Sequence, residues 1–223
     1  MKKLRAALPG IVLLVAFAVF TVLVCTVGRE PVPANNPDGL GFAKLNRAVN
    51  EFFTPNRTVY NITEILGYLT WCVVAFFGLL GLSQLIGRKS LLKVDSDILL
   101  LGGGYAVMLA GYVLFEKVIL NYRPEYPWHT GAPEASYPSS HTLMLVFVMV
   151  TAVMQIRRRM KAGALRTTAV IACLAVAAVV VIGRLVCGVH WFTDIIGGVL
   201  LASALSALYY GLAFGGASDE KKD

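Results

Sequence analysis

His190 and Asp194 stand at a spacing that suits nucleophilic catalysis. The two residues are four apart, so on a helix they would share one face. Asp194 could then hold one imidazole nitrogen of His190 and leave the other free as a nucleophile. His141 is a second imidazole, of the kind that protonates a leaving alcohol. Taken alone, the His190–Asp194 pair is best interpreted as a structural hydrogen bond, and two ligands of a metal ion are the other alternative.

Three cationic side chains accompany these residues along the chain. Lys117 and Arg123 precede His141, and Arg184 precedes His190. A guanidinium group binds two phosphate oxygens at once, and an ammonium group adds a point charge. Each arginine alone would be interpreted as an anchor that reaches the membrane interface. Together with the histidines, the cations indicate a site for a phosphoryl group.

The stretch from Tyr137 to His141 predicts the start of a helix. Pro138 disfavours helical backbone at Tyr137, so we expect the helix to open with Ser139, Ser140 and His141. Backbone N–H groups at a helix start lack partners within the helix and form an anion site. Ser139 and Ser140 are therefore candidate phosphate-binding residues.

The third histidine and the nearby acids form no metal-binding pattern. A metal site needs more ligands than His190 and Asp194 supply, and His129 belongs to no ligand spacing. We therefore expect neither a metal ion nor an organic cofactor. His129, Glu125 and Glu134 are interpreted as loop residues that line the entrance of the site.

A membrane-embedded helical bundle must position these side chains. Of the 223 residues, 57% are hydrophobic and 15% charged, with a mean hydropathy of +0.69. This composition excludes a disordered protein, a coiled coil and a nucleic-acid binder, and the four cysteines indicate no disulfide scaffold. A helix needs roughly 20 apolar residues to cross a bilayer. Six segments qualify or nearly qualify, at about 8–27, 65–86, 98–115, 142–156, 167–182 and 195–214.

The predicted fold is therefore all-α, with six transmembrane helices and the candidate site at one membrane interface. A row of small residues, Gly198, Ala202 and Ser206, predicts close helix packing. The loop 28–64 contains apolar residues at helical spacing, which predict a helix lying on the membrane interface. A lid over substrate entry is the alternative interpretation of this loop.

The lysines and arginines predict the orientation in the membrane. With the N-terminus inside, 13 of them fall on the inner side and 7 on the outer side, which follows the positive-inside rule. Both termini are then cytoplasmic and the site is extracytoplasmic. The first segment is interpreted as an uncleaved anchor, because no small-x-small cleavage site follows it promptly.

Three motifs resemble those of the type 2 phosphatidic acid phosphatase family, which are membrane lipid phosphatases related to vanadium haloperoxidases. The family carries Lys-x6-Arg-Pro, Pro-Ser-Gly-His and Ser-Arg-x5-His-x3-Asp. This chain has Arg123-Pro124, then Pro138-Ser139-Ser140-His141, then Gly183-Arg184-x5-His190-x3-Asp194. The resemblance covers roughly residues 60–214. It implies an N-terminal anchor and interfacial segment over 1–60, a phosphatase core over 61–214 and a short cytoplasmic tail over 215–223.

The resemblance implies a role for each matching residue. His190 corresponds to the nucleophile, Asp194 to its partner and His141 to the general acid, while the phosphate would be bound by Arg123, Arg184 and Ser139.

The chain departs from the family pattern at three positions. Ser140 replaces a glycine, and Gly183 replaces a serine, which removes one hydroxyl donor. The family lysine stands seven residues before the arginine, where this chain has Glu116 and then Lys117. We expect Lys117 to contact phosphate and Glu116 to point to water or to a neighbouring cation.

The resemblance implies an integral-membrane lipid phosphatase that works through a phosphohistidine without a metal. The expected substrate is a lipid phosphomonoester or diphosphate, such as undecaprenyl diphosphate, phosphatidylglycerophosphate or phosphatidate. Membrane lipids are the expected partners, nucleic acid is not, and no oligomeric state is predicted. A lipid phosphotransferase with the same site is one alternative. A small transporter is the other, disfavoured because transporters place polar groups near the bilayer midplane.

Overall fold

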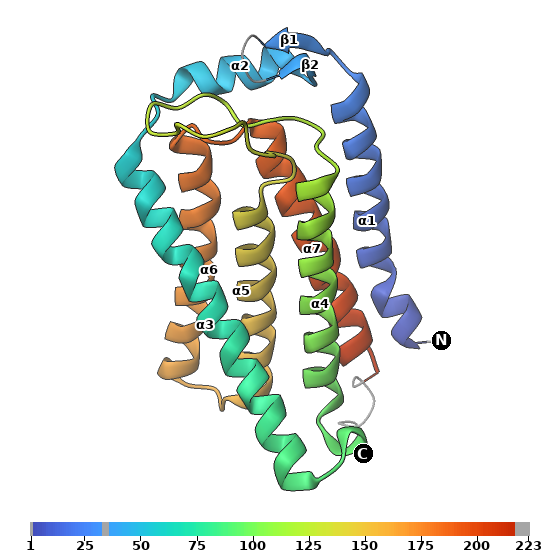
Figure 1. Cartoon of the computed structure of the whole chain (residues 1–223). Coiled ribbons are helices and arrows are strands. Elements are labelled where there is room, and N and C mark those ends of the chain that lie inside the picture. The colour runs from blue at the N-terminus through green and yellow to red at the C-terminus, as the bar shows by residue number, and fades with distance from the viewer. Residues whose placement is uncertain (1, 33–35, 217–223) are drawn as a thin grey trace.

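Six long apolar helices run between the two ends of the molecule (Figure 1). The structure is a computed structural model that describes residues 2–32 and 36–216. All six helices are long and apolar enough to cross a membrane, and each overlaps one predicted segment. The largest difference is at Arg57, where the second long helix begins eight residues before the predicted Ile65. The helices are α1 Lys2–Thr26, α3 Arg57–Arg88, α4 Ser96–Lys117, α5 Ser140–Arg159, α6 Ala164–Val186 and α7 Phe192–Phe214. This confirms the all-α, six-span prediction.

Short elements cover one end, which we call the hairpin end (Figure 1). Strands β1 (Glu30–Val32) and β2 (Asn36–Leu40) form an antiparallel hairpin, and α2 (Ala43–Phe52) follows. The helix α2 is the one that the spacing of apolar residues predicts. Its buried Asn46 donates to Thr193 Oγ1 (3.0 Å) and accepts from the Thr193 backbone N–H (3.1 Å). This contact fixes α2 on the first turn of α7.

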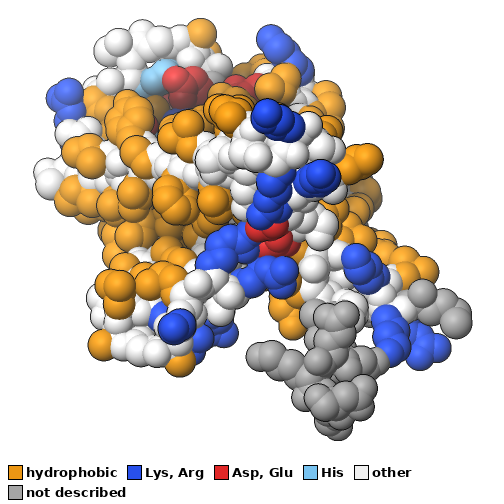
Figure 2. Space-filling view, turned by 90° about the horizontal axis from the view of Figure 1, so that it is seen from below, with side chains coloured by type: hydrophobic (Ala, Val, Ile, Leu, Met, Phe, Trp, Pro, Cys, Tyr) orange, Lys and Arg blue, Asp and Glu red, His pale blue; other side chains and the backbone are white. Residues whose placement is uncertain are grey.

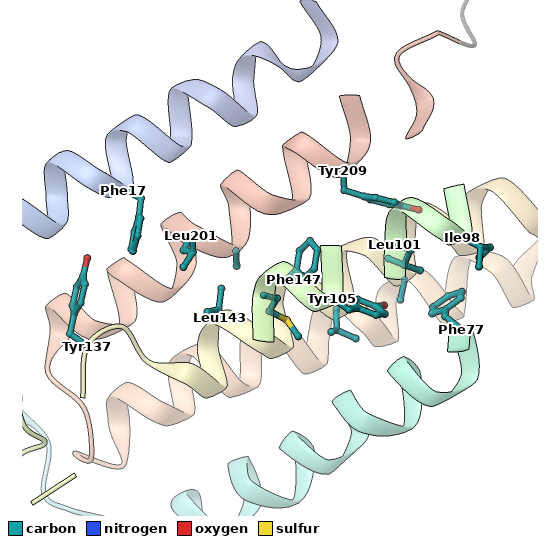
Figure 3. Close-up of a cluster of buried hydrophobic side chains, with 14 of the residues drawn as sticks. Phe17, Phe77, Ile98, Leu101, Tyr105, Tyr137, Leu143, Phe147, Leu201 and Tyr209 are labelled. Atoms are coloured by element: carbon teal, nitrogen blue, oxygen red, sulfur yellow. The ribbon is translucent and has the colours of Figure 1, made fainter. Parts of the chain in front are cut away.

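The core lies where α5 and α7 pass between the other helices (Figure 3). Phe147 and Leu143 of α5 pack with Leu201 of α7 and with aromatic rings from α1, α3 and α4. About half of the apolar window of α5 and α7 is buried, compared with 17% in α1 and 11% in α3. The exposed apolar faces of the outer helices suit a hydrocarbon surrounding.

Close packing joins the start of α5 to α7 at the hairpin end. A Cβ atom at Gly198 would lie 2.9 Å from the Ser139 carbonyl oxygen, so only glycine fits. Ala202 and Ser206, the other members of the predicted small-residue row, are buried. Tyr137 stacks against Phe17 of α1 with ring centroids 6.3 Å apart. The segment that enters α5 is therefore held from two sides.

The opposite end, which we call the basic end, gathers lysines and arginines around a few acids (Figure 2). The 3₁₀ helix η1 (Leu91–Lys93) joins α3 to α4 there. Asp97 is buried and pairs with Arg159 Nη1 (2.7 Å) and with Arg158 Nε (3.2 Å). Helix α1 begins and α7 ends at this same end (Figure 1), as an even number of spans requires.

Candidate active site

The turn between α6 and α7 presents His190. Helix α6 ends at Val186, and the chain reverses through Gly188, whose φ of +72° favours glycine. His190 precedes α7, so the expectation that His190 and Asp194 share a helix face is wrong. Asp194 lies in the first turn of α7, where its Oδ2 accepts from the Trp191 backbone N–H (2.9 Å). The carboxylate of Asp194 thus caps the helix.

Ser136 connects His190 to Asp194. The distance from His190 Nδ1 to Asp194 Oδ2 is 3.6 Å, too long for a good hydrogen bond. The Ser136 hydroxyl lies between them, 3.2 Å from His190 Nδ1 and 2.5 Å from Asp194 Oδ2. Asn121 donates to the other oxygen, Oδ1, at 3.1 Å. Neither Ser136 nor Asn121 belongs to a motif in the sequence, and both come from the loop between α4 and α5.

His190 keeps its second nitrogen without a partner. Nε2 is buried and makes no hydrogen bond within the described structure. Burial lowers the pKa of His190 well below its usual range, and the charges of Arg123 and Arg184 lower it further. The ring is therefore neutral near pH 7. A neutral imidazole whose Nδ1 lies against Ser136 and whose Nε2 is free has the arrangement of a nucleophile.

Arg184 lies fully buried beside this ring system. Its Nη1 donates to Glu64 Oε1 (2.8 Å) and Thr63 Oγ1 (3.3 Å), and Nη2 lies 3.2 Å from His141 Nδ1. The guanidinium carbon is 5.2 Å from the centre of the Tyr60 ring. Its Nε is buried without a hydrogen-bond partner. Arg184 therefore contacts His141 through Nη2 and retains the N–H of Nε as a donor for a ligand.

Glu64 is a site residue that the sequence analysis missed. Its Oε1 lies 3.3 Å from His141 Nε2, whereas Arg184 Nη2 lies beside the other ring nitrogen, Nδ1. The prediction placed residues 28–64 in a loop, whereas α3 begins at Arg57 and brings Glu64 to the site. A signal was present, because Glu64 is the only acidic residue in the sequence of α3. An acid in a membrane-spanning helix usually faces the interior and serves a function.

Two glycines allow α3 to approach the site closely. A Cβ atom at Gly183 would lie 2.6 Å from Thr63 Cγ2, so a serine would not fit here. The Thr63 hydroxyl instead accepts from Arg184 Nη1 (3.3 Å) and donates to the Tyr60 carbonyl (2.7 Å). It therefore holds Arg184 in place but does not replace the donor that is lost with the family serine. A Cβ atom at Gly67 would lie 3.2 Å from the His141 ring. Helix α3 therefore contributes more to the site than the motifs indicate.

Arg123 lines a cavity of about 520 Å³ that is open at the hairpin end. Its Nη1 pairs with Glu134 at 3.0 Å. Glu125, His129 and Glu134 line the same cavity, as expected for entrance residues.

The two serines at the start of α5 differ in their surroundings. Ser139 is the N-cap of α5; its hydroxyl accepts from the Thr142 N–H (3.5 Å) and its own N–H donates to the Asp194 carbonyl (3.0 Å). Ser140 lines a second cavity of about 180 Å³, together with His141. Lys117 is exposed at the last residue of α4, and Glu116 before it is exposed as well.

The described side chains offer donors for an anion and few ligands for a cation. Within residues 2–32 and 36–216, no group of three or more His, Cys, Asp or Glu side chains is placed to hold a metal ion. Two arginines, two imidazoles and one helix start converge instead. This donor set suits a phosphoryl group.

Comparisons with known proteins agree with this fold. The family model of the PAP2 superfamily matches residues 98–215. The fold is similar to that of a transmembrane PAP2-type phosphatidylglycerolphosphate phosphatase from Bacillus subtilis, with a TM-score of 0.63 and 19% identity, covering 91% of this chain and 94% of that one. No curated protein matches the sequence.

These findings define a multi-pass membrane protein. The chain belongs to the PAP2 superfamily, and it is a membrane phosphatase of that family.

Proposed function

We propose that this phosphatase hydrolyses a phosphorylated membrane lipid through a phosphohistidine on His190. The observation that carries the proposal is the buried His190 Nε2, free of partners beside Arg184, with Nδ1 facing Ser136 and Asp194. A buried polar atom without a partner is rare and calls for an explanation. A phosphorus atom that Nε2 can attack supplies one.

In the first step, Nε2 attacks phosphorus while the bond from phosphorus to the leaving alcohol oxygen breaks. His141 gives that oxygen a proton. Arg184 and Arg123, now paired with Glu64 and Glu134, would exchange those carboxylates for phosphate oxygens. Asp194 stabilises the positive charge that develops on His190, acting directly and through Ser136.

In the second step, water attacks the phosphorus of the phosphohistidine and the phosphorus–nitrogen bond breaks. His141, which has lost its proton, takes one from the water. Inorganic phosphate leaves, and both histidines return to their starting states. The arginines carry the charge stabilisation in both steps, so we propose a reaction without a metal ion.

The lipid nature of the substrate is supported by the position of the site. The cavity beside His141 is bordered by Tyr68 and Trp71 of a candidate membrane span, and both are exposed on its surface. A substrate whose tail stays in the bilayer could therefore reach His141. The solved neighbour acts on phosphatidylglycerolphosphate, which belongs to this class, as do phosphatidate and undecaprenyl diphosphate.

A phosphate-release assay on the purified full chain tests the proposal. A panel of lipid phosphates and matched water-soluble phosphate esters is supplied, with and without a chelator. We expect lipid substrates to be cleaved, chelator to leave the rate unchanged and vanadate to inhibit. Acid-labile phosphate should be trapped on the protein. Release from the soluble esters alone, or activity that one divalent ion must restore, would contradict the proposal.

The proposed site faces away from the cytoplasm, because the basic end carries most of the arginines and lysines. A cysteine introduced at Glu134, in a variant without the four native cysteines, should react with an impermeant thiol reagent in intact cells. A cysteine at Lys161, in the loop after α5, is the matched control and should react only after the membrane is opened. The reverse pattern would invert the topology.

A further inference from the structure

The carboxylate of Glu64 occupies the junction between the two groups that would handle the leaving oxygen. One atom, Oε1, lies 2.8 Å from Arg184 Nη1 and 3.3 Å from His141 Nε2. A substrate oxygen would make the same two contacts. Because Glu64 projects from the helix α3, its charge stays close to this position whether or not Arg184 exchanges it for phosphate.

Glu64 also forms part of the wall of the cavity beside His141. This cavity of about 180 Å³ is bordered by neutral side chains of α3, α4 and α5, including Tyr68, Trp71 and Tyr112. Among the described residues that line it, Glu64 is the only acid, and none is a lysine or an arginine. The adjoining small cavity, which shares Tyr112 and Ser140, adds Glu116 and again no lysine or arginine among its described lining.

The leaving group of the substrate must lie in this region. His141 can protonate only an oxygen within hydrogen-bond reach, and the cavity adjoins His141 on the side of the candidate membrane spans. For a phosphomonoester, the leaving group is a neutral alcohol. For a diphosphate, it is a lipid monophosphate, whose negative charge would lie beside Glu64 in a cavity with no lysine or arginine among its described lining residues.

We propose that Glu64 makes the enzyme selective for lipid phosphomonoesters over lipid diphosphates, an inference that rests on the function proposed above. A like charge placed against the wrong substrate is an effective way to reject it. The neutral wall accepts the alcohol of a monoester, and the carboxylate opposes the extra phosphate of a diphosphate.

Two lipids that share one tail test this inference. Phosphatidate and diacylglycerol diphosphate with identical acyl chains differ only in the leaving group. Initial loss of each starting lipid is measured with the purified full chain. We expect kcat/KM to favour phosphatidate by at least ~10-fold. In Glu64→Gln, which keeps the shape of the side chain, the ratio should narrow by at least ~5-fold through faster cleavage of the diphosphate. Glu51→Gln, at an exposed position of α2, is the matched control and should keep the wild-type ratio.

A second variant leaves Glu64 and its contacts in place. Tyr68→Lys puts an ammonium group one helical turn from Glu64, at a position that is 67% exposed. Tyr68→Lys should also lower the ratio of kcat/KM for phosphatidate to kcat/KM for the diphosphate, by ~3-fold. This variant tests the inference even if Glu64→Gln fails to fold.

Three results would overturn the inference. The first is a wild-type preference for the diphosphate. The second is a ratio that neither variant changes, which would leave Glu64 only a structural role beside Arg184 and His141. The third is cleavage of neither lipid by the wild type, which would overturn the lipid phosphatase proposal itself and this inference with it.

Discussion

Both ends of the bundle bury a carboxylate next to basic side chains, but they leave different atoms unpaired. At the basic end, Asp97 pairs with two arginines and accepts from Gln155 Nε2 at 3.1 Å. At the hairpin end, Asp194 accepts from Ser136, Asn121 and a backbone N–H. The two carboxylates are similarly buried, but the arginine partners of Asp97 are partly exposed, whereas Ser136 and Asn121 are buried.

The two ends differ in the kind of buried side-chain atom that lacks a hydrogen-bond partner. At the basic end, the described side-chain atoms without a partner include Asp97 Oδ1 and Gln155 Oε1, which are both acceptors. At the hairpin end they include one acceptor, Asn121 Oδ1, but also Arg184 Nε and His190 Nε2, a cationic donor and a free imidazole nitrogen. Unpaired acceptors repel a phosphate, whereas a donor and a nucleophile bind and attack it. Buried charge alone therefore does not identify a site; the unpaired atoms do.

Replacing the nucleophile should produce the largest effect. We expect His190→Ala to lower kcat by at least ~10³-fold, because the arginines alone cannot form the phosphoenzyme. The variant should remain folded in detergent, since Nε2 makes no contact that stabilises the fold. Phosphate release and thermal unfolding are measured on the same preparation. Near-normal phosphate release would show that His190 is not the nucleophile.

Replacing the connecting hydroxyl should lower kcat by less than replacing the nucleophile. Ser136→Ala should lower kcat by ~10–100-fold, because Nδ1 of His190 loses its hydrogen-bonded link to Asp194. KM should change little, and Ser136→Thr should restore much of the rate, which a loss of folded protein would not explain. Ser83→Ala is the matched control, because that hydroxyl bonds only to the Leu80 carbonyl of its own helix. Equal activity of Ser136→Ala and wild type would remove Ser136 from the mechanism.

A smaller effect is expected at Lys117. One residue on a helix is a rotation of about 100°, so its register differs from that of the family lysine. Lys117 ends α4, and the chain beyond it is not helical, which gives its long side chain freedom to reach back. Lys117→Ala should lower kcat/KM by at least ~10-fold, while Glu116→Gln changes it little. Full activity of Lys117→Ala would show that Lys117 does not contact phosphate and that the arginines bind it without a lysine.

The apolar segments made the fold predictable. Six runs of apolar residues give six helices, because a bilayer admits only backbone that satisfies its own hydrogen bonds. The hairpin β1–β2 was missed because strands of three and five residues, containing Pro31 and Pro37, show too little alternation. The start of α3 was missed because its first turns are polar, while hydropathy reports only the part within the hydrocarbon.

The motifs made only part of the site predictable. They contain His141, Arg184, His190 and Asp194, which the fold brings to the hairpin end. Ser136, Asn121, Thr63 and Glu64 lie outside the motifs, and their positions depend on how a loop and α3 pack. The contact between Thr63 and Gly183 joins helices 120 residues apart in sequence, and a single sequence does not encode such a pair in any local pattern.

Replacing the buried aspartate by asparagine at each end of the bundle distinguishes the two networks. The smallest effect on catalysis is expected at the basic end. Asp97→Asn removes a carboxylate that is 2% exposed, but the side chains of its arginine partners are 48% and 26% exposed and can turn to water. We expect Asp97→Asn to lower the free energy of unfolding by about 1–2 kcal/mol, which lowers the Tm by roughly 3–6 °C. Because Asp97 lies at the basic end, kcat of the folded enzyme should stay within about twofold of wild type.

Asp194→Asn is the matched variant at the hairpin end and should lower kcat by at least ~10²-fold, because the imidazolium of His190 then lacks its counter-charge. A large loss of kcat in Asp97→Asn, at an unchanged Tm, would show that the basic end takes part in turnover.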